Sequence, residues 1–173
     1  GAKFDLRSNA LRPAGWTSAD AAGLPIYPGL AKAGEASNSR INHALRVTVE
    51  ESQRGYVDPA RHFASSSNDR SLPPMGLRLR LKAGYGLSGF SGQALAIMKA
   101  MKKYGLIVAD NGSDWFISGT PDRRWNDDVL DQLKSSAPAG GKIELSKEVV
   151  ADLAAEFPEM AELQYKTLQK LVD

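Results

Sequence analysis

The 173-residue chain contains no cysteine, which excludes disulfide bonds, thiolate metal sites and cysteine nucleophiles. No apolar run approaches the roughly 18 residues that a transmembrane helix needs, so the sequence predicts no membrane span. Only two histidines are present, His43 and His62, and imidazole chemistry is limited to them. No signal peptide is recognisable and Gly1 stands first, so we expect a processed product or a fragment of a longer precursor.

The bulk composition is that of an ordinary globular domain. Hydrophobic residues make up 42% of the chain and charged residues 24%, enough to build a core and to disfavour disorder. The net charge of +2 is too small to indicate nucleic acid as a partner. Residues 141–173 hold four lysines and seven acids, which leaves +5 on residues 1–140. The acidic tail is typical of a solvated surface, and the alternative is docking on the body or on a basic partner.

Hydrophobic periodicity predicts four strands and one long helix. Alternation predicts strands over 43–49 and 77–82, the latter with Leu on one face and Arg or Lys on the other. Asn111-Gly112, between apolar strands 106–110 and 114–118, predicts a β-hairpin. A helix over 92–104 follows from the apolar stripe of Ala94, Ile97, Met98 and Met101. Ser91 is its expected N-cap and Gly105 its C-cap.

The remaining segments are long and irregular. Frequent Pro and Gly predict loops that wrap one end of the sheet over 1–40 and 50–75. A short helix is expected over 126–134. The domain organisation predicted is a β-rich domain over 1–134, a linker-like run over 135–141 and an amphipathic helical tail over 142–173. The fold class predicted is α+β or mainly β, with an antiparallel sheet or jelly-roll-like sandwich.

The run from Gly84 to Gly89 matches the GxGxxG pattern of dinucleotide-binding loops. Strand 77–82 alternates, however, whereas a parallel strand of that fold is apolar on both faces. The helix also begins beyond the last glycine, away from where a pyrophosphate would bind. We therefore interpret Gly84–Gly89 as a flexible connection and predict no cofactor.

The candidate catalytic residues are the two histidines with one carboxylate. His62 is the candidate acid or base, and His43 or Asp110 would tune it. No local metal-binding spacing is present, so the metal question stays open. Two separate structural histidines are the alternative interpretation.

The candidate ligand-binding residues are cations and loop aromatics. Guanidinium groups bind carboxylate or phosphate in a bidentate manner, and loop aromatics stack on sugar rings. A solvated sheet face and buried loop anchors are the alternatives. The candidates are Arg46, Arg61, Arg78, Arg80, Trp16 and Tyr56.

Several runs resemble a family of predicted secreted bacterial proteins of unassigned function. They are SNALRPAGWTSADAAGLPIYPGL from Ser8, INHALR from Ile41, PARHFASS from Pro59, LPPMGLRLRLK from Leu72 and KKYGLIVADNGSDWFISG from Lys102. The resemblance covers about residues 3–128 and implies a β-rich extracellular or cell-surface protein. The relatives extend upstream with more β-type sequence and lack the tail after Gly140.

These patterns predict an extracellular domain that binds or acts on carbohydrate, with an acidic glycan favoured by the arginines. Whether the chain is an enzyme stays open. The alternative is a structural or interaction protein of the cell surface, or a subunit of a larger assembly. Its partner would be another protein or the upstream segment of the same precursor.

Overall fold

The computed structural model describes residues 2–5 and 7–136, and four strands and four helices lie in these ranges. None of the helices in this part of the chain has the length and hydropathy needed to cross a bilayer. The predicted tail over 142–173, and most of the predicted linker, lie outside the described residues. In chain order the elements are α1 (Ile26–Gly29), α2 (Ala33–Ser37), β1 (Leu45–Val49), β2 (Arg78–Leu79), α3 (Gly92–Lys103), β3 (Leu106–Asn111), β4 (Phe116–Ile117) and α4 (Asp127–Ser136).

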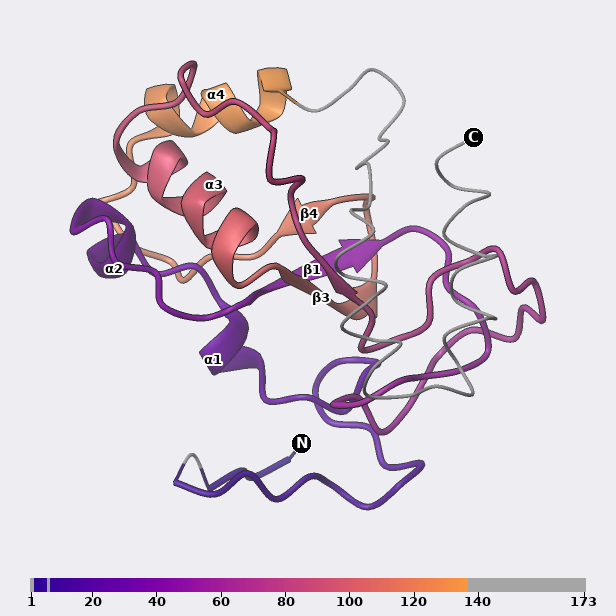
Figure 1. Cartoon of the computed structure of the whole chain (residues 1–173). Helices are drawn as coiled ribbons and strands as arrows, with labels where there is room; N and C mark the ends of the chain where they lie inside the picture. The colour runs from indigo at the N-terminus through magenta and orange to yellow at the C-terminus, as the bar shows by residue number, and fades with distance from the viewer. Residues whose placement is uncertain (1, 6, 137–173) are drawn as a thin grey trace.

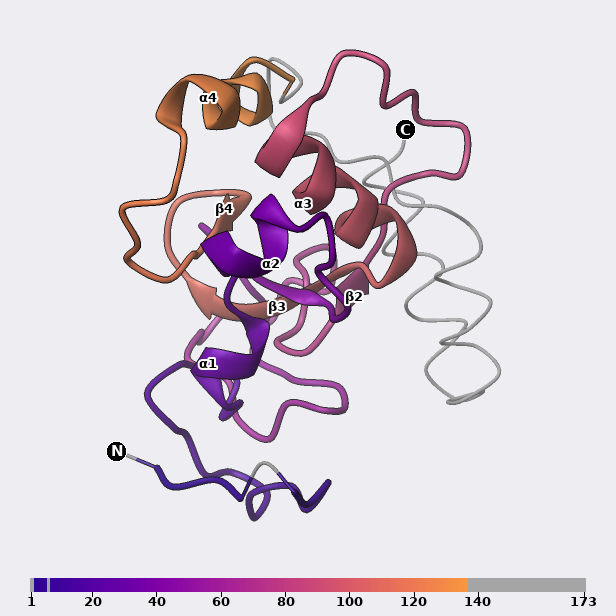
Figure 2. The same cartoon turned by 90° about the vertical axis from the view of Figure 1, so that its left-hand side faces the viewer.

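The strands form one open sheet in the order β2-β3-β1-β4. The central strands β1 and β3 are parallel, and the short strands β2 and β4 pair antiparallel at the two edges. Helices α2, α3 and α4 lie on one side of the sheet, while α1 and the N-terminal segment lie on the other (Figures 1 and 2). We call these the helix face and the cavity face of the sheet. The α+β class is therefore confirmed.

The helix face is apolar because alternate strand residues point to it. Leu79, Leu106 and Leu45 lie side by side across three strands and are almost completely buried. They belong to the same core cluster as Ile97 and Met101 of α3. Full burial of each such side chain stabilises the fold by about 1.5–3 kcal/mol. This layer is the main hydrophobic core.

Helix α3 forms where the periodicity predicts it. Its apolar residues are buried, and its C-terminus is followed by Gly105 at φ +81°, a left-handed conformation that favours glycine. A Cβ there would lie 2.3 Å from the Leu79 carbonyl oxygen, so glycine is also required for close packing. Ser91 occupies the N-cap position without a capping hydrogen bond. Its backbone N–H instead donates to Gln132 Oε1 of α4.

The predicted hairpin at Asn111-Gly112 is wrong. Strand β1 lies between β3 and β4, so the chain crosses the end of β1 instead of turning back beside β3. The N–H groups of Gly112 and Trp115 donate to the carbonyls of Val49 and Thr48, and the Thr48 hydroxyl donates to the Ser113 carbonyl at 2.6 Å. Pairing with β1 therefore overrides the local turn preference.

The predicted antiparallel sheet is also corrected, because its central pair is parallel. The described residues show a single mixed sheet and do not show a sandwich or jelly roll. The strand predicted over 77–82 is reduced to Arg78–Leu79, and that over 43–49 to Leu45–Val49. Within the predicted loop 50–75, Tyr56 forms an isolated bridge with Met75. The short helix predicted over 126–134 is confirmed as α4.

Candidate functional site

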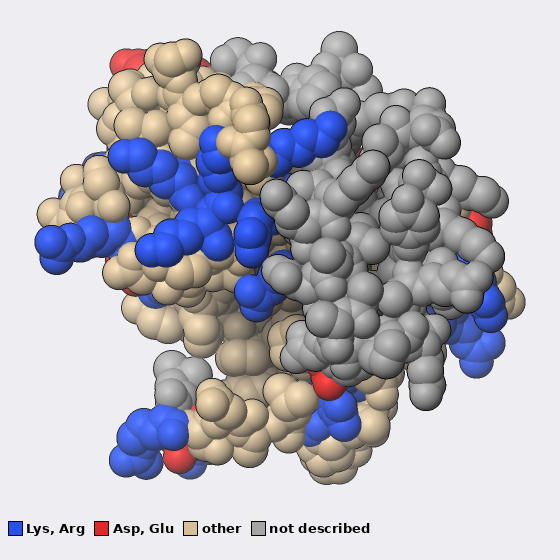
Figure 3. Space-filling model, in the orientation of Figure 1, with Lys and Arg blue, Asp and Glu red and all other residues tan. Residues whose placement is uncertain are grey.

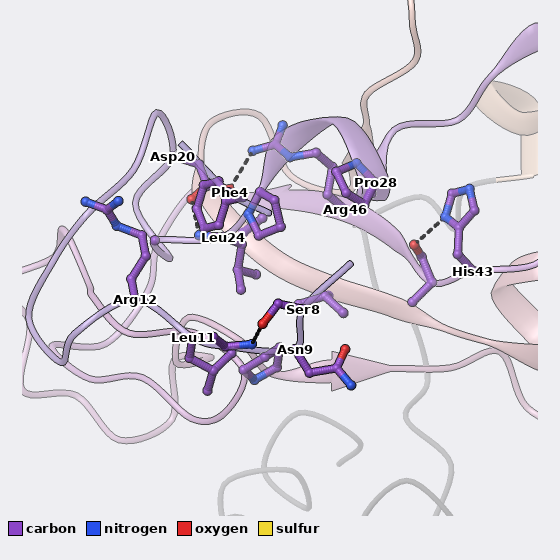
Figure 4. A pocket seen from close by; sticks show the side chains of 18 of the residues that line it. Phe4, Ser8, Asn9, Leu11, Arg12, Asp20, Leu24, Pro28, His43 and Arg46 are labelled. Carbon is purple, nitrogen blue, oxygen red and sulfur yellow. Dashed lines mark hydrogen bonds and ion pairs between the residues drawn. The ribbon is translucent and has the colours of Figure 1, made fainter. Parts of the chain in front are cut away.

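A cavity of about 370 Å³ lies between the cavity face of the sheet and the N-terminal segment (Figure 4). Phe4, Asp5 and residues 8–12 form one wall, the segment from Asp20 to Gly29 forms another, and strand residues form the floor. The floor includes a row across three strands, because Ile107 of β3 pairs with Arg46 on one side and Arg78 on the other. Arg46 and Arg78 therefore lie on the same face of the sheet, with Ile107 between them.

Arg46 is held by acids and by the strand beside it. Its Nη2 lies 3.6 Å from Asp20 Oδ2 and 3.9 Å from Asp110 Oδ2, and its Nη1 donates to Ser118 Oγ at 3.1 Å. The side chain is only 12% exposed. A Cβ on Gly29 would lie 3.2 Å from Arg46 Cβ, so α1 packs directly against this side chain. Arg46 therefore links α1, β1 and β4 at the cavity wall.

Asp20 is the most buried charged group at the cavity, with its side chain 1% exposed. Its Oδ1 accepts the Leu24 N–H at 3.0 Å and the Ser18 hydroxyl at 3.1 Å, which closes the loop before α1. Burial raises the pKa of Asp20, and the hydrogen bonds and Arg46 offset only part of that rise. The charged form of Asp20 therefore destabilises the fold, and the neighbouring Arg46 guanidinium offsets part of that cost.

Two further arginines line the cavity, Arg12 and Arg78. Neither forms an ion pair within residues 2–5 and 7–136. The guanidinium of Arg12 lies 5.8 Å from the ring centroid of Phe4 and 5.4 Å from that of Trp16. Both cations are therefore available to an anion in the cavity.

Unsatisfied polar atoms gather in this wall. In the described part of the chain, three buried side-chain nitrogen or oxygen atoms make no hydrogen bond: Arg12 Nε, Asp20 Oδ2 and Arg46 Nε. All three belong to residues that line the cavity. Buried polar groups are nearly always paired in folded proteins, so a water or a ligand in the cavity would supply the partners that these atoms lack.

His43 lies at the edge of the cavity within a charged cluster. Its Nε2 is 3.0 Å from Glu35 Oε2 and 3.4 Å from Lys32 Nζ, and its Nδ1 is 2.9 Å from the Ala44 carbonyl oxygen. Partial burial pushes the pKa of Glu35 upward, but hydrogen bonds from His43 and Lys32 outweigh it, so the pKa lies below its usual value.

His62 and Arg61 belong to a different set of contacts. His62 Nδ1 lies 2.9 Å from the Ala21 carbonyl oxygen, and its ring stacks on Phe63. Arg61 Nε donates to the Arg12 carbonyl and Nη1 to Asp58 Oδ1. Neither residue lines the cavity. The structure therefore brings Asp110 to Arg46, His43 to Glu35 and His62 to Ala21, in three separate arrangements.

The other predicted residues are divided in the same way. Trp16 is 58% exposed and contacts Arg12 from outside the cavity lining. Tyr56 is partly buried and stacks on Phe63. Arg80 follows β2 and does not line the cavity. Of the predicted ligand-binding residues, Arg46 and Arg78 are the two that line it.

Sequence reasoning missed Phe4, Arg12 and Asp20. All three lie in the irregular first 40 residues, where no periodicity tells which side chains turn inward. One signal exists for Asp20, because Ser and Asp two residues apart before Gly-Leu-Pro favour a turn closed by side-chain oxygens. No comparable signal marks Arg12.

A second hollow lies beside α2 and is wider and shallower, with a volume of about 970 Å³. It is lined mainly by polar residues, among them Asn38, Arg40, Thr120, Asp122 and Arg124. Across the ranges that the structure describes, no group of three or more His, Asp or Glu side chains could hold a metal ion.

The glycine loop after β2 has open surroundings. A Cβ on Gly84, Gly86 or Gly89 would meet no atom within 4 Å. Strand β2 pairs antiparallel with β3, whereas a dinucleotide-binding loop connects parallel strands. Comparison of the chain with protein-family models, curated proteins and solved structures finds no match.

Proposed function

We propose that this domain binds an acidic carbohydrate, with one uronate-type sugar residue in the cavity. The observation that carries the proposal is the pair of arginines, Arg12 and Arg78, that line the cavity without an acidic partner among the described residues. Guanidinium binds carboxylate in a bidentate, charge-assisted manner. An anionic ligand would supply the partners that these two side chains lack.

The charge balance of the cavity favours an anion. Three arginines (Arg12, Arg46 and Arg78) and two aspartates (Asp5 and Asp20) line the cavity, so its charged lining carries one positive charge. Asp5 pairs with Arg7, which does not line the cavity, and Arg46 also faces Asp110 from outside the lining. The Asp20 carboxylate is closed off by Leu24, Ser18 and Arg46, so it presents little charge to a ligand.

The apolar part of the lining suits a sugar ring. Ring and aliphatic side chains cover much of the wall and the floor: Phe4, Leu11, Leu24, Pro25, Pro28 and Ile107. Pyranose rings present C–H groups that pack on such surfaces while their hydroxyls and carboxylate contact polar groups. The volume of about 370 Å³ lies at the lower end of the range for small-molecule sites, about 300–1,000 Å³.

We propose binding and not catalysis, because the candidate acid and base groups each contact a different partner and do not meet in one site. His43 contacts Glu35 and Lys32, His62 contacts the Ala21 carbonyl, and Asp110 contacts Arg46. An acidic glycan outside the cell is the ligand source that fits the secreted character implied by the sequence resemblance.

Isothermal titration calorimetry tests the proposal directly. Galacturonate and glucuronate should bind, and galactose and glucose should bind much more weakly. Arg78→Gln should weaken uronate binding by about 10- to 100-fold, since a hydrogen bond to a charged group is worth about 1.5–3 kcal/mol. Arg123→Gln, an exposed cation away from the cavity, is the matched control and should leave binding unchanged. Equal binding of neutral and acidic sugars would refute the proposal.

A further inference from the structure

The middle of the chain carries cations without acids. Residues 71–109 contain six Lys and Arg residues and no Asp or Glu. Figure 3 shows Lys and Arg side chains gathered over α3 and the strand next to it. We call this set the basic surface: Arg78, Arg80, Lys82, Lys99, Lys102 and Lys103.

Two neighbouring segments build the basic surface. The segment after β2 runs beside the end of α3, because the Leu81 N–H donates to the Met101 carbonyl and Lys102 Nζ donates to the Tyr85 carbonyl. On α3 itself, Lys99 lies three and four residues before Lys102 and Lys103, so the three share one side of the helix.

The basic surface is continuous with the cavity through Arg78. This residue lines the cavity and is exposed on the edge strand β2. Its Cγ lies 3.5 Å from where a Cβ on Gly105 would be, directly beyond the end of α3. Lys103 follows, with its Nζ 5.0 Å from the centroid of the Tyr104 ring. Arg78 therefore lies next to the C-terminal end of α3, where Lys102 and Lys103 are placed.

Helix stability explains only part of this arrangement. Lysines in the last turn of a helix interact favourably with its dipole, which accounts for Lys102 and Lys103. The dipole does not account for Lys99, which lies one turn before the last turn of α3. Like charges gathered on one face repel each other, and a bound polyanion relieves that repulsion.

From this geometry we infer that the ligand is a polymer: an acidic polysaccharide that places one sugar residue in the cavity and lays its neighbours across the basic surface. This inference rests on the proposed function and names the form of its ligand. A polysaccharide fits better than single-stranded nucleic acid, which needs aromatic side chains on which successive bases stack. Beside the basic surface, Tyr85 is 37% exposed and the ring of Tyr104 is covered by Lys103.

The experiment compares galacturonate with hexagalacturonate by calorimetry on the full chain. Hexagalacturonate should bind wild type at least tenfold more tightly than galacturonate, and the difference should shrink as salt rises. The triple variant Lys99→Gln/Lys102→Gln/Lys103→Gln should lose about tenfold in hexamer affinity and keep its monomer affinity. Arg54→Gln/Arg70→Gln/Arg123→Gln removes three exposed cations elsewhere and should bind both ligands as wild type does.

The outcomes separate this inference from the proposed function. If galacturonate fails to bind, the proposed function is wrong, and the inference falls with it. If galacturonate binds but the first triple variant keeps full hexamer affinity, the inference alone is overturned. Tighter binding of a single-stranded oligodeoxynucleotide of equal charge would also overturn it, since the basic surface would then recognise nucleic acid.

Discussion

The two faces of the sheet are built from the same strands but have different roles, because one packs in the hydrophobic core and the other lines the cavity. On the helix face, Leu45, Leu79 and Leu106 form an apolar row against α3. On the cavity face, the residues adjacent to these leucines in sequence are Arg46, Arg78 and Ile107. Alternation along a strand therefore places the stabilising layer and the binding layer back to back. Core packing can hold the cavity groups in place although those groups cost stability.

The largest expected effect is the difference in stability between a substitution on the helix face and one on the cavity face. Leu45→Ala, at a side chain with 0% exposure, should lower the free energy of unfolding by about 2–5 kcal/mol, because it leaves a cavity in the core. Ile107→Ala removes a half-buried side chain of the cavity floor and should cost clearly less while weakening uronate binding. Urea denaturation and calorimetry measure the two quantities. Equal losses of stability would break the distinction between the faces.

The next effect concerns the buried ion pair of the cavity face. Arg46→Met keeps the length of the side chain but leaves the Asp20 carboxylate, 1% exposed, without its counter-charge. Loss of one partner from a buried pair costs about 3–5 kcal/mol; the lower end is expected here, since the two charged atoms are 3.6 Å apart. Urea denaturation gives the value.

The matched control is the double variant Asp20→Asn/Arg46→Met. Asparagine keeps an oxygen for the Leu24 N–H and removes the buried charge. The double variant should therefore recover more than half of the lost stability. An Arg46→Met variant as stable as wild type would show that Asp20 does not depend on Arg46.

A smaller effect is the pH dependence that Asp20 imposes. Because its pKa is raised in the folded state, the folded protein binds more protons than the unfolded chain between the two pKa values. The contribution of Asp20 to stability therefore falls as pH rises from 3.8 through the raised pKa, and stays level above it. Asp20→Asn lacks this loss, so its stability relative to wild type should increase through that window. Urea titrations from about pH 3 to about pH 8 measure the difference, and a difference that does not change with pH would contradict it.

The sequence predicted the helix face better than the cavity face, for a physical reason. Hydrophobic periodicity indicates which side of a helix or strand is buried, so it predicts α3 and the buried leucines of the strands. It carries no information on strand direction, and so the parallel pairing of β1 with β3 was missed. Asn111-Gly112 satisfies a local turn rule, but hydrogen bonds to Thr48 and Val49 outweigh it.

The sequence predicted two residues of the cavity floor, Arg46 and Arg78, but no residue of the cavity walls. Arg46 and Arg78 share a face because each alternates with buried apolar neighbours. Arg12 and Asp20 reach the same cavity from an irregular segment, and only tertiary contacts such as Asp20 with Arg46 place them. His62 was predicted from the scarcity of histidine and from its place in a long loop beside Arg61, and neither feature specifies what its side chain contacts.

The smallest expected effect lies outside both faces, in the second hollow. Hydrogen bonds from the Arg124 side chain and backbone lower the pKa of Asp122 to about 2. The stability from this pair is therefore present above pH 3.8 and is lost as pH falls toward about 2. The Arg124 side chain is 67% exposed, so Arg124→Gln should barely change stability at neutral pH. Its carboxyl titration, followed by NMR, should show the pKa of Asp122 returning toward 3.8, and an unchanged pKa would contradict this assignment.

NMR titration of the labelled chain with galacturonate tests the central claim, that the cavity face is the binding face. The backbone amides of Gly29, Ile107 and Ala109, which line the cavity, should show the largest shifts, and Arg78→Gln should reduce them at equal ligand concentration. Shifts confined to the second hollow, at residues such as Asn38 and Thr120, with the cavity amides unmoved, would contradict the account.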